Sequence, residues 1–359
     1  MTEDKIKEVL SKVKEPVLNV DFVKLGFVNS ISLNGNDLKL TLGISEIPEN
    51  VRSETIEIIK NEFKKSLPGI NSVEVTFVQG ITEHVNEKKS SVLPGIKNTI
   101  AVASGKGGVG KSTIAVNIAV ALAEKGFKVG LIDADIYGPS IPLMFDLKGK
   151  PGITKVGDKN KLVPMEKYGV KVMSIGFLME ADTAVVWRGP MASSALKQFM
   201  ADVVWGDLDF LLFDMPPGTG DIQLTLSQTI PLTGAVIVST PQEISIADAK
   251  KGYIMFEKVN VPTLGIIENM SYYINPDGSK EFIFGKDGGR KMADEFNVNL
   301  LGEIPVNTKI RAGGDEGKPS VLTDKDSEEI FGKIASDVIK EINKKNTERV
   351  NTPDVVIEI

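Results

Sequence analysis

The 359-residue sequence contains no cysteine and a single histidine, His84, which lies in a polar segment. The lack of thiols excludes disulfide bonds and thiolate metal ligands, because both require the cysteine sulfur. We expect His84 to be solvated, since a lone histidine among polar residues is rarely a ligand. A metal ion bound by this chain is therefore expected to have oxygen ligands, which favours Mg²⁺.

Long apolar runs are also missing. No segment approaches the roughly 18 apolar residues of a membrane-spanning helix, and the first residues, MTEDKIKEVL, lack the apolar core of a signal peptide. The formal net charge is −6 and the pI is about 5.2, which argues against a broad surface for nucleic acid or anionic lipid. We expect a cytoplasmic protein that binds neither nucleic acid nor membranes.

The hydrophobic pattern divides the chain into four parts. Residues 1–79 combine amphipathic helical stretches with three strands, two of them around an Asn-Gly-Asn turn, which predicts a small α+β domain. Residues 80–97 are polar and charged and contain Pro-Gly, which indicates a linker. Residues 98–345 alternate apolar strands with helices, which predicts a mostly parallel sheet with helices on both faces. Residues 346–359 form a short tail.

A glycine-rich stretch, GKGGVGKS, follows the first strand of the larger domain and opens a helix. It fits the phosphate-binding pattern G-x-x-x-x-G-K-[ST] in the context that this pattern requires. Backbone N–H groups and the positive end of the helix attract phosphates. Lys111 is expected to reach the β- and γ-phosphates, and Ser112 to bind Mg²⁺. The predicted nucleotide-binding residues here are Gly105, Lys106, Gly107, Gly108, Val109, Gly110, Lys111, Ser112 and Thr113.

Three aspartates at strand ends are candidates for the metal site. Asp214 ends the buried strand of DFLLFDMPPGTGD, a pattern typical of the carboxylate that holds Mg²⁺ in such proteins. Asp133 and Asp135 end another apolar strand, and alternate residues of a strand point the same way. Beside a Mg²⁺-nucleotide, one can hold a metal-bound water and the other, Asp135, can orient the attacking water. The alternative is that both only form a turn. The predicted metal site comprises Ser112, Asp133, Asp135 and Asp214.

The stretch GKGGVGKST also carries a second lysine, Lys106. It resembles the deviant phosphate loop of the signature-lysine ATPases, which include MinD, ParA and the nitrogenase iron protein. The resemblance implies that Lys106 reaches the nucleotide of the partner in a homodimer. A lysine supplied in this way neutralises transferred charge, so hydrolysis depends on dimerisation. The catalytic prediction is Lys106, Lys111 and Asp135 in slow, dimer-dependent ATP hydrolysis. The alternative is that Lys106 is a solvated lysine at a loop tip.

Further segments are similar to the Mrp family of ATP-binding iron–sulfur cluster carriers. They are DADIYGPSIP, WRGPMASSALKQF, DFLLFDMPPGTGDIQLTLSQ, VIVSTPQEISIADAKKG and IIENMSYY. The resemblance covers residues 95–345, and 1–79 more weakly. It implies a homodimer that serves apoproteins or assembly factors, with Asn269 at the adenine and the loop from Pro305 to Arg311 over the base. Trp187 and Arg188 could sense nucleotide, contact a partner, or pack a loop onto the sheet.

One departure from that family concerns its cluster ligands. After ENMSY the family carries two cysteines spaced C-P-x-C, which bridge the dimer and hold the cluster, whereas this chain has Asn275 and Gly278 in those places. Neutral asparagine and glycine are poor iron ligands beside thiolate. The chain thus binds no cluster, holds one through unusual ligands or external thiols, or has another cargo. The alternative function is a ParA/MinD-like positioning switch that binds a surface or partner.

Overall fold

The computed structural model describes residues 2–86, 92–136, 138–178 and 189–351. The chain forms two compact units. One contains residues 1–84 together with 339–359, and the other contains residues 85–338. The sequence-based division differs from this one, since it assigned residues 80–84 to a linker and 339–345 to the larger domain.

The first unit contains a three-stranded sheet and two helices on one of its faces. The order is β1-β2-β3, with β1 and β2 antiparallel and β2 and β3 parallel. Apolar residues of both helices and of β2 share one buried cluster. The small α+β domain expected from the sequence is therefore present. Its elements are α1 (Glu3–Leu10), β1 (Val28–Asn34), β2 (Asp37–Ile44), α2 (Glu49–Ser66) and β3 (Ser72–Gln79).

His84 is buried in this unit, with only 2% of its surface exposed. Its Nδ1 lies 3.3 Å from Oδ1 of Asn346, a residue of helix α11 (Lys325–Asn351). The expectation of a solvated histidine is wrong, because a distant helix supplies a polar partner. The same helix extends to Asn351, so the first residues of the expected tail are helical, while residues 352–359 lie outside the described part.

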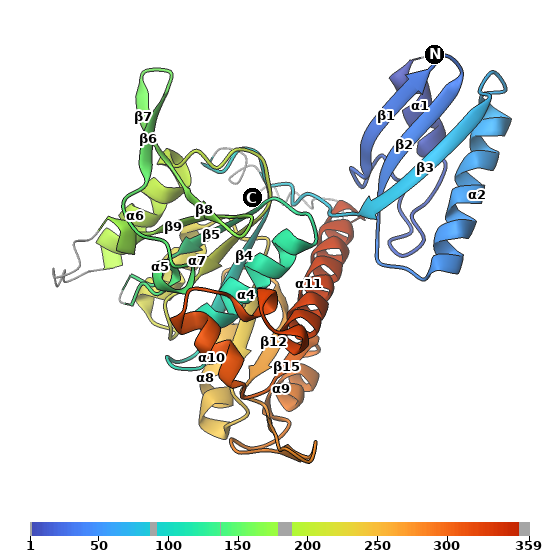
Figure 1. Cartoon of the computed structure of the whole chain (residues 1–359). Coiled ribbons are helices and arrows are strands. Elements are labelled where there is room, and N and C mark those ends of the chain that lie inside the picture. Colours follow the sequence, from blue (N-terminus) through green and yellow to red (C-terminus); the bar gives the residue numbers. More distant parts are fainter. Residues whose placement is uncertain (1, 87–91, 137, 179–188, 352–359) are drawn as a thin grey trace, which may run out of the picture. The chain divides into compact units, whose positions relative to one another are not determined.

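An eight-stranded sheet forms the centre of the second unit (Figure 1). Its strands are β4 (Ile96–Ser104), β5 (Val129–Asp133), β8 (Met165–Lys167), β9 (Val170–Ser174), β10 (Leu208–Asp214), β11 (Gly234–Ser239), β12 (Thr263–Asn269) and β15 (Leu300–Ile304). The spatial order is β15-β12-β11-β4-β10-β5-β9-β8, and all neighbours are parallel except β8 and β9. The predicted, mostly parallel sheet is confirmed.

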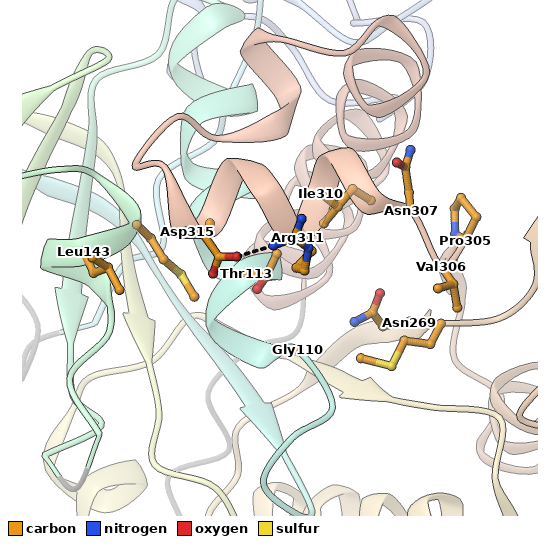
Figure 2. Close-up of a pocket in the computed structure, with 13 residues that line it drawn as sticks. Gly110, Thr113, Leu143, Asn269, Pro305, Val306, Asn307, Ile310, Arg311 and Asp315 are labelled. Carbon is orange, nitrogen blue, oxygen red and sulfur yellow. Dashed lines mark hydrogen bonds and ion pairs between the residues drawn. The ribbon is translucent and has the colours of Figure 1, made fainter.

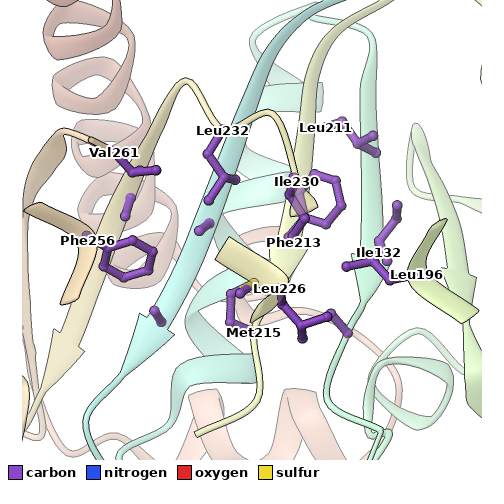
Figure 3. Close-up of a cluster of buried hydrophobic side chains, with 14 of the residues drawn as sticks. Ile132, Leu196, Leu211, Phe213, Met215, Leu226, Ile230, Leu232, Phe256 and Val261 are labelled. Carbon is purple, nitrogen blue, oxygen red and sulfur yellow. The ribbon is translucent and has the colours of Figure 1, made fainter. Parts of the chain in front are cut away.

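Helices cover both faces of this sheet. On one face, apolar residues of α6, α7, α8 and α9 share a buried cluster with alternate strand residues such as Ile132 and Phe213 (Figure 3). On the other face, α4 contacts β4, β5 and β10. The helices are α4 (Lys111–Glu124), α5 (Ile141–Met144), α6 (Gly189–Asp202), α7 (Asp221–Thr229), α8 (Glu243–Lys258), α9 (Gly288–Phe296) and α10 (Thr308–Asp315), with 3₁₀ turns η1 (Ile175–Phe177) and η2 (Ser320–Leu322).

Two small hairpins were not expected from the sequence. Their strands are β6 (Gly152–Val156) with β7 (Lys159–Val163), and β13 (Tyr273–Ile274) with β14 (Lys280–Glu281). Their residues are mostly exposed, so they lack the apolar pattern from which a strand is recognised. In the part of the chain that the structure describes, no helix is long and apolar enough to cross a membrane.

Candidate functional site

The glycine-rich stretch forms a tight loop between β4 and α4. Gly110 has φ +84°, and a Cβ atom placed there would collide with the amide nitrogen of Asn269. A Cβ atom at Gly105 would collide with the Asp248 carbonyl group in α8. Only glycine fits these positions, so the loop can lie close to both neighbouring elements. The loop leads directly into the amino end of α4 at Lys111, as a phosphate site requires.

Lys111 brings together most of the predicted catalytic and metal-binding residues. Its Nζ lies 2.5 Å from Oδ1 of Asp214 and 3.5 Å from Oδ2 of Asp135. It also lies 3.3 Å from Oγ of Ser112. Lys111 is 6% exposed and Asp214 fully buried, so this is a charged cluster shielded from water. Coulombic interactions are strong in such surroundings.

The parallel pairing of strands explains why the carboxylates meet. Asp214 at the end of β10 pairs in register with Asp133 at the end of β5, and Asp135 follows two residues later. Burial raises the pKa of Asp133 well above its ordinary value of 3.8, and the neighbouring Asp214 raises it further. Burial also raises the pKa of Asp214, although Lys111 opposes this rise. Cations are therefore needed here to keep the carboxylates charged.

The free oxygens of this cluster fit Mg²⁺. Oδ1 of Asp135 and Oδ2 of Asp214 are buried and have no hydrogen-bond partner among the described residues. Together with the Ser112 hydroxyl they are hard oxygen donors, which Mg²⁺ prefers. The described residues contain no group of three or more acidic, histidine or cysteine side chains that could hold a metal by themselves. Such an ion would thus depend on nucleotide oxygens and water as well.

Asp133 is engaged differently from the other two aspartates. Its Oδ2 accepts hydrogen bonds from Oγ of Ser174 (2.9 Å) and from the Ile141 N–H (3.3 Å), and its Oδ1 accepts from the Asp135 N–H (3.2 Å). These three donors favour a structural role, in which Asp133 holds the turn that presents Asp135. Its assignment as a metal ligand stays a prediction.

Lys106 lies in the loop and is half-buried. Its backbone carbonyl accepts a hydrogen bond of 2.9 Å from Oγ of Ser104. Within the described ranges, no ion pair or hydrogen bond engages its ammonium group. The side chain is thus available for a nucleotide of another subunit, and that role stays a prediction. Trp187 and Arg188 lie outside the described residues.

A pocket of about 310 Å³ opens beside the phosphate loop (Figure 2). The nucleotide-binding residues predicted beyond the loop, Asn269, Pro305 and Arg311, all line it. Asn269 also donates a 2.8 Å hydrogen bond to the Val109 carbonyl of the loop, so the pocket and the loop are directly joined. The other lining residues are Gly110, Thr113, Leu143, Met144, Met270, Val306, Asn307, Ile310, Gly314 and Asp315.

Two apolar lining residues, Leu143 and Met144 of α5, were missed by the sequence interpretation. The segment DADIYGPSIP had been interpreted as aspartates before a turn and as a family motif, and no helix was predicted after it. The signal that could have identified α5 is Pro142 in its first turn, a favoured position for proline. Leu143 and Met144 line the pocket together with residues of the segment from Pro305 to Arg311. The pocket can therefore hold a flat ring system, such as a nucleotide base, next to the phosphate loop.

The cluster position of the resemblance lies in the hairpin of β13 and β14. Asn275 and Gly278 form its turn, where the Gly278 N–H donates to the Asn275 carbonyl at 2.9 Å. Asn275 Nδ2 donates to Oγ of Ser279, which in turn donates to Asp277. The chain supplies no thiolate here or elsewhere, so these residues do not fit an iron–sulfur cluster.

Comparisons with known proteins match one family model to each of the two parts of the chain. A family model described as NUBPL iron-transfer P-loop NTPase matches residues 95–342, and one described as iron–sulfur cluster assembly protein matches residues 3–77. The iron–sulfur cluster carrier protein of Synechocystis sp. is 42% identical over 330 residues, covering 91% of this chain and 93% of the relative.

Two further similarities agree. The iron–sulfur cluster carrier protein of Escherichia coli K12 is 43% identical over 320 residues, covering 89% of this chain and 86% of the relative. A solved nucleotide-binding protein of Archaeoglobus fulgidus, in complex with ADP, is 39% identical with a TM-score of 0.60, covering 69% of this chain and 98% of that one. The chain therefore belongs to the family of iron-transfer P-loop NTPases.

Proposed function

We propose that this chain is an ATP-hydrolysing homodimer that serves iron–sulfur cluster assembly as a carrier or an ATP-dependent adaptor. The observation that carries the proposal is the contact of Lys111 with Asp214, Asp135 and Ser112 at the phosphate loop. Buried opposite charges next to an anion-binding loop are the constellation that Mg²⁺-ATP needs.

In this proposal the residues at and beside the loop have distinct tasks, and Asp135 has two. Lys111 neutralises the β- and γ-phosphates, and Ser112 and Asp214, with Asp135 beside them, would hold Mg²⁺, which supplies further positive charge when bound. Asp135 orients the attacking water through its unpaired Oδ1. Lys106 of one subunit reaches the nucleotide of the other, so turnover is slow and depends on the dimer.

The pocket beside the loop receives the adenine. Asn269 meets the polar edge of the base, because its amide is already fixed against the loop. The segment from Pro305 to Arg311 covers the base, and Leu143 supplies apolar contact from the opposite wall.

The cargo or substrate of the pathway is an iron–sulfur cluster, which is carried to apoproteins or exchanged with assembly factors in the cytoplasm. Since the chain has no thiolate, the partner or an external thiol must supply the cluster ligands. The names of the relatives support this pathway. The alternative of a positioning switch on a surface is not favoured by them.

The test combines a phosphate-release assay with light scattering. The wild type should hydrolyse ATP slowly and dimerise when ATP is added. Lys106→Ala should keep most of its ATP affinity but lose turnover and the ATP-induced dimer. Lys159→Ala, which removes an exposed lysine of the β6–β7 hairpin, is the matched control and should behave as wild type. Unchanged turnover of Lys106→Ala as a strict monomer would contradict the proposal.

A further inference from the structure

Helix α10 lines the pocket proposed for the base. The segment after α10 leads into η2, and the buried amide of Asn117 forms hydrogen bonds that join η2 to α4, the helix that follows the phosphate loop. Asn117 lies one turn after Thr113 in α4 and is 2% exposed. Its Oδ1 accepts hydrogen bonds from Oγ of Ser320 (3.1 Å) and from the Val321 N–H (3.0 Å), both in η2. Its Nδ2 donates to the Thr113 carbonyl at 2.8 Å.

The amino end of α10 is held separately. Asn307 caps the helix by accepting the Lys309 N–H at 2.8 Å. Nζ of Lys309 lies 2.6 Å from Oδ1 of Asp324, whose other oxygen accepts from Ser327. This anchor joins α10 to the start of α11, and within the described ranges its residues form no hydrogen bond or ion pair with the phosphate loop. Among the described residues, the hydrogen bonds that join η2 to the phosphate-loop helix are those of Asn117.

The hydrogen bonds of Asn117 satisfy both ends of its amide in a dry environment. Truncating Asn117 leaves the hydroxyl of Ser320 and the N–H of Val321 without their acceptor. A buried polar group that loses its hydrogen-bond partner lowers the stability of the fold more than an exposed one does. The short connection from α10 to η2 then loses its hydrogen bonds to α4, while Gly317 within it still accepts a bond of 2.9 Å from the Tyr168 hydroxyl. Thr113 and Ile310 line the pocket from α4 and α10, so the width of the pocket depends on the hydrogen bonds to α4.

We propose that Asn117 is a positioning residue for nucleotide selection, which sets the distance between α10 and the phosphate-loop helix and so the fit of the base. Asn117 lies outside the phosphate loop and is not among the residues that line the pocket. This inference rests on the proposed function, since it requires that the pocket receives the base of a nucleotide. Loss of Asn117 should weaken ligands that carry a base and leave triphosphate binding alone largely unchanged.

The experiment compares Mg²⁺-ATP with Mg²⁺-tripolyphosphate by titration calorimetry on the full chain. Asn117→Ala should weaken ATP binding roughly tenfold, the effect of about one lost buried hydrogen bond, while tripolyphosphate affinity changes less than about twofold. Ser320→Ala removes one of the two donors and should show a smaller loss with the same selectivity. It also decides the matter if Asn117→Ala does not fold.

Asn343→Ala is a closely matched control. Asn343 is also a helical asparagine with 2% exposure, accepts one N–H and one O–H, both from Thr82, and donates to the Gly80 carbonyl. It belongs to the first compact unit. Its truncation should lower the thermal unfolding midpoint as Asn117→Ala does, but leave the preference for ATP intact.

The outcomes distinguish a failure of the proposed base site from a failure of the proposed role of Asn117. If the wild type itself binds ATP no better than tripolyphosphate, the pocket does not receive the base, and both the proposed base site and this inference fail. If the wild type prefers ATP and both Asn117→Ala and Ser320→Ala keep the full preference, the base site stands and the role of Asn117 is overturned. Equal losses for both ligands would place Asn117 in phosphate binding instead and would also overturn it.

Discussion

Two strands of the large sheet, β4 and β12, end at the same edge but lead into very different segments. After β4, the loop gathers buried charges, and two carboxylate oxygens there have no partner among the described residues. After β12, the β13–β14 hairpin is exposed, and Asn275, Asp277 and Ser279 bond to one another. Unsatisfied buried groups indicate a missing ligand, whereas a turn that satisfies itself does not. The nucleotide chemistry of the family is therefore retained and its cluster ligands are not.

The strongest test of the loop side removes its central cation. Lys111→Ala should abolish detectable ATP binding, because the triphosphate loses its compensating charge and the buried Asp214 loses its ion-pair partner. Equilibrium binding of a fluorescent ATP analogue measures this. Tight binding with full turnover in this variant would show that the nucleotide lies elsewhere.

The hairpin side can be tested by restoring the missing thiols. After anaerobic reconstitution and desalting without small thiols, the wild type should retain almost no iron. The double variant Asn275→Cys/Gly278→Cys recreates the C-P-x-C spacing around Pro276 and should retain up to about four iron and four sulfide per dimer. Iron and sulfide assays measure both.

The control for that variant places two cysteines with the same spacing in the other exposed hairpin, as Lys155→Cys/Asp158→Cys. It should retain no more iron than the wild type. Stable cluster binding by the wild type would mean that oxygen or nitrogen ligands suffice. It would contradict the inference that the segment after β12, unlike the loop after β4, has no ligand.

A smaller effect is expected from removing the charge of Asp324, whose ion pair with Lys309 holds α10. Burial acts to raise the pKa of Asp324, but the bonds from Lys309 and Ser327 outweigh it, so the pKa lies below its ordinary value of 3.8. The resulting stability is present above that ordinary value and is lost as pH falls through the folded-state pKa. Asp324→Asn should lower the urea midpoint at pH 7, and the difference from wild type should shrink in strong acid. A pH-independent difference would contradict the charge-based explanation.

The parts of the fold that could be predicted depend on neighbouring residues. The seven parallel strands have near-continuous apolar sequences because helices cover both sheet faces, and the phosphate loop is a contiguous motif in the context it needs. The motif patterns assigned Lys111 and Asp214 to one site although they lie 103 positions apart, but their direct contact was not predicted. These predictions required no knowledge of side-chain packing.

The unpredicted parts depend on distant contacts. His84 is buried because Asn346, 262 positions away, lies against it, and no local pattern carries that information. Leu143 and Met144 enter the pocket through a four-residue helix that is too short for a periodic signal. The hairpins are exposed on both faces, so hydrophobic alternation is absent from them.

The close approach of Gly110 and Asn269 also has a consequence for sequence variation. Because the amide of Asn269 fills the space where a side chain at position 110 would begin, the two positions form a single steric unit. Position 110 is therefore not free to accept a side chain while the amide of Asn269 keeps this place. A library randomised at both positions and selected for ATP binding should return glycine at 110 whenever Asn269 is present, and other residues at 110 only together with a smaller one at 269. Such pairs would have to tolerate the left-handed backbone at residue 110, so asparagine or aspartate is the expected replacement there.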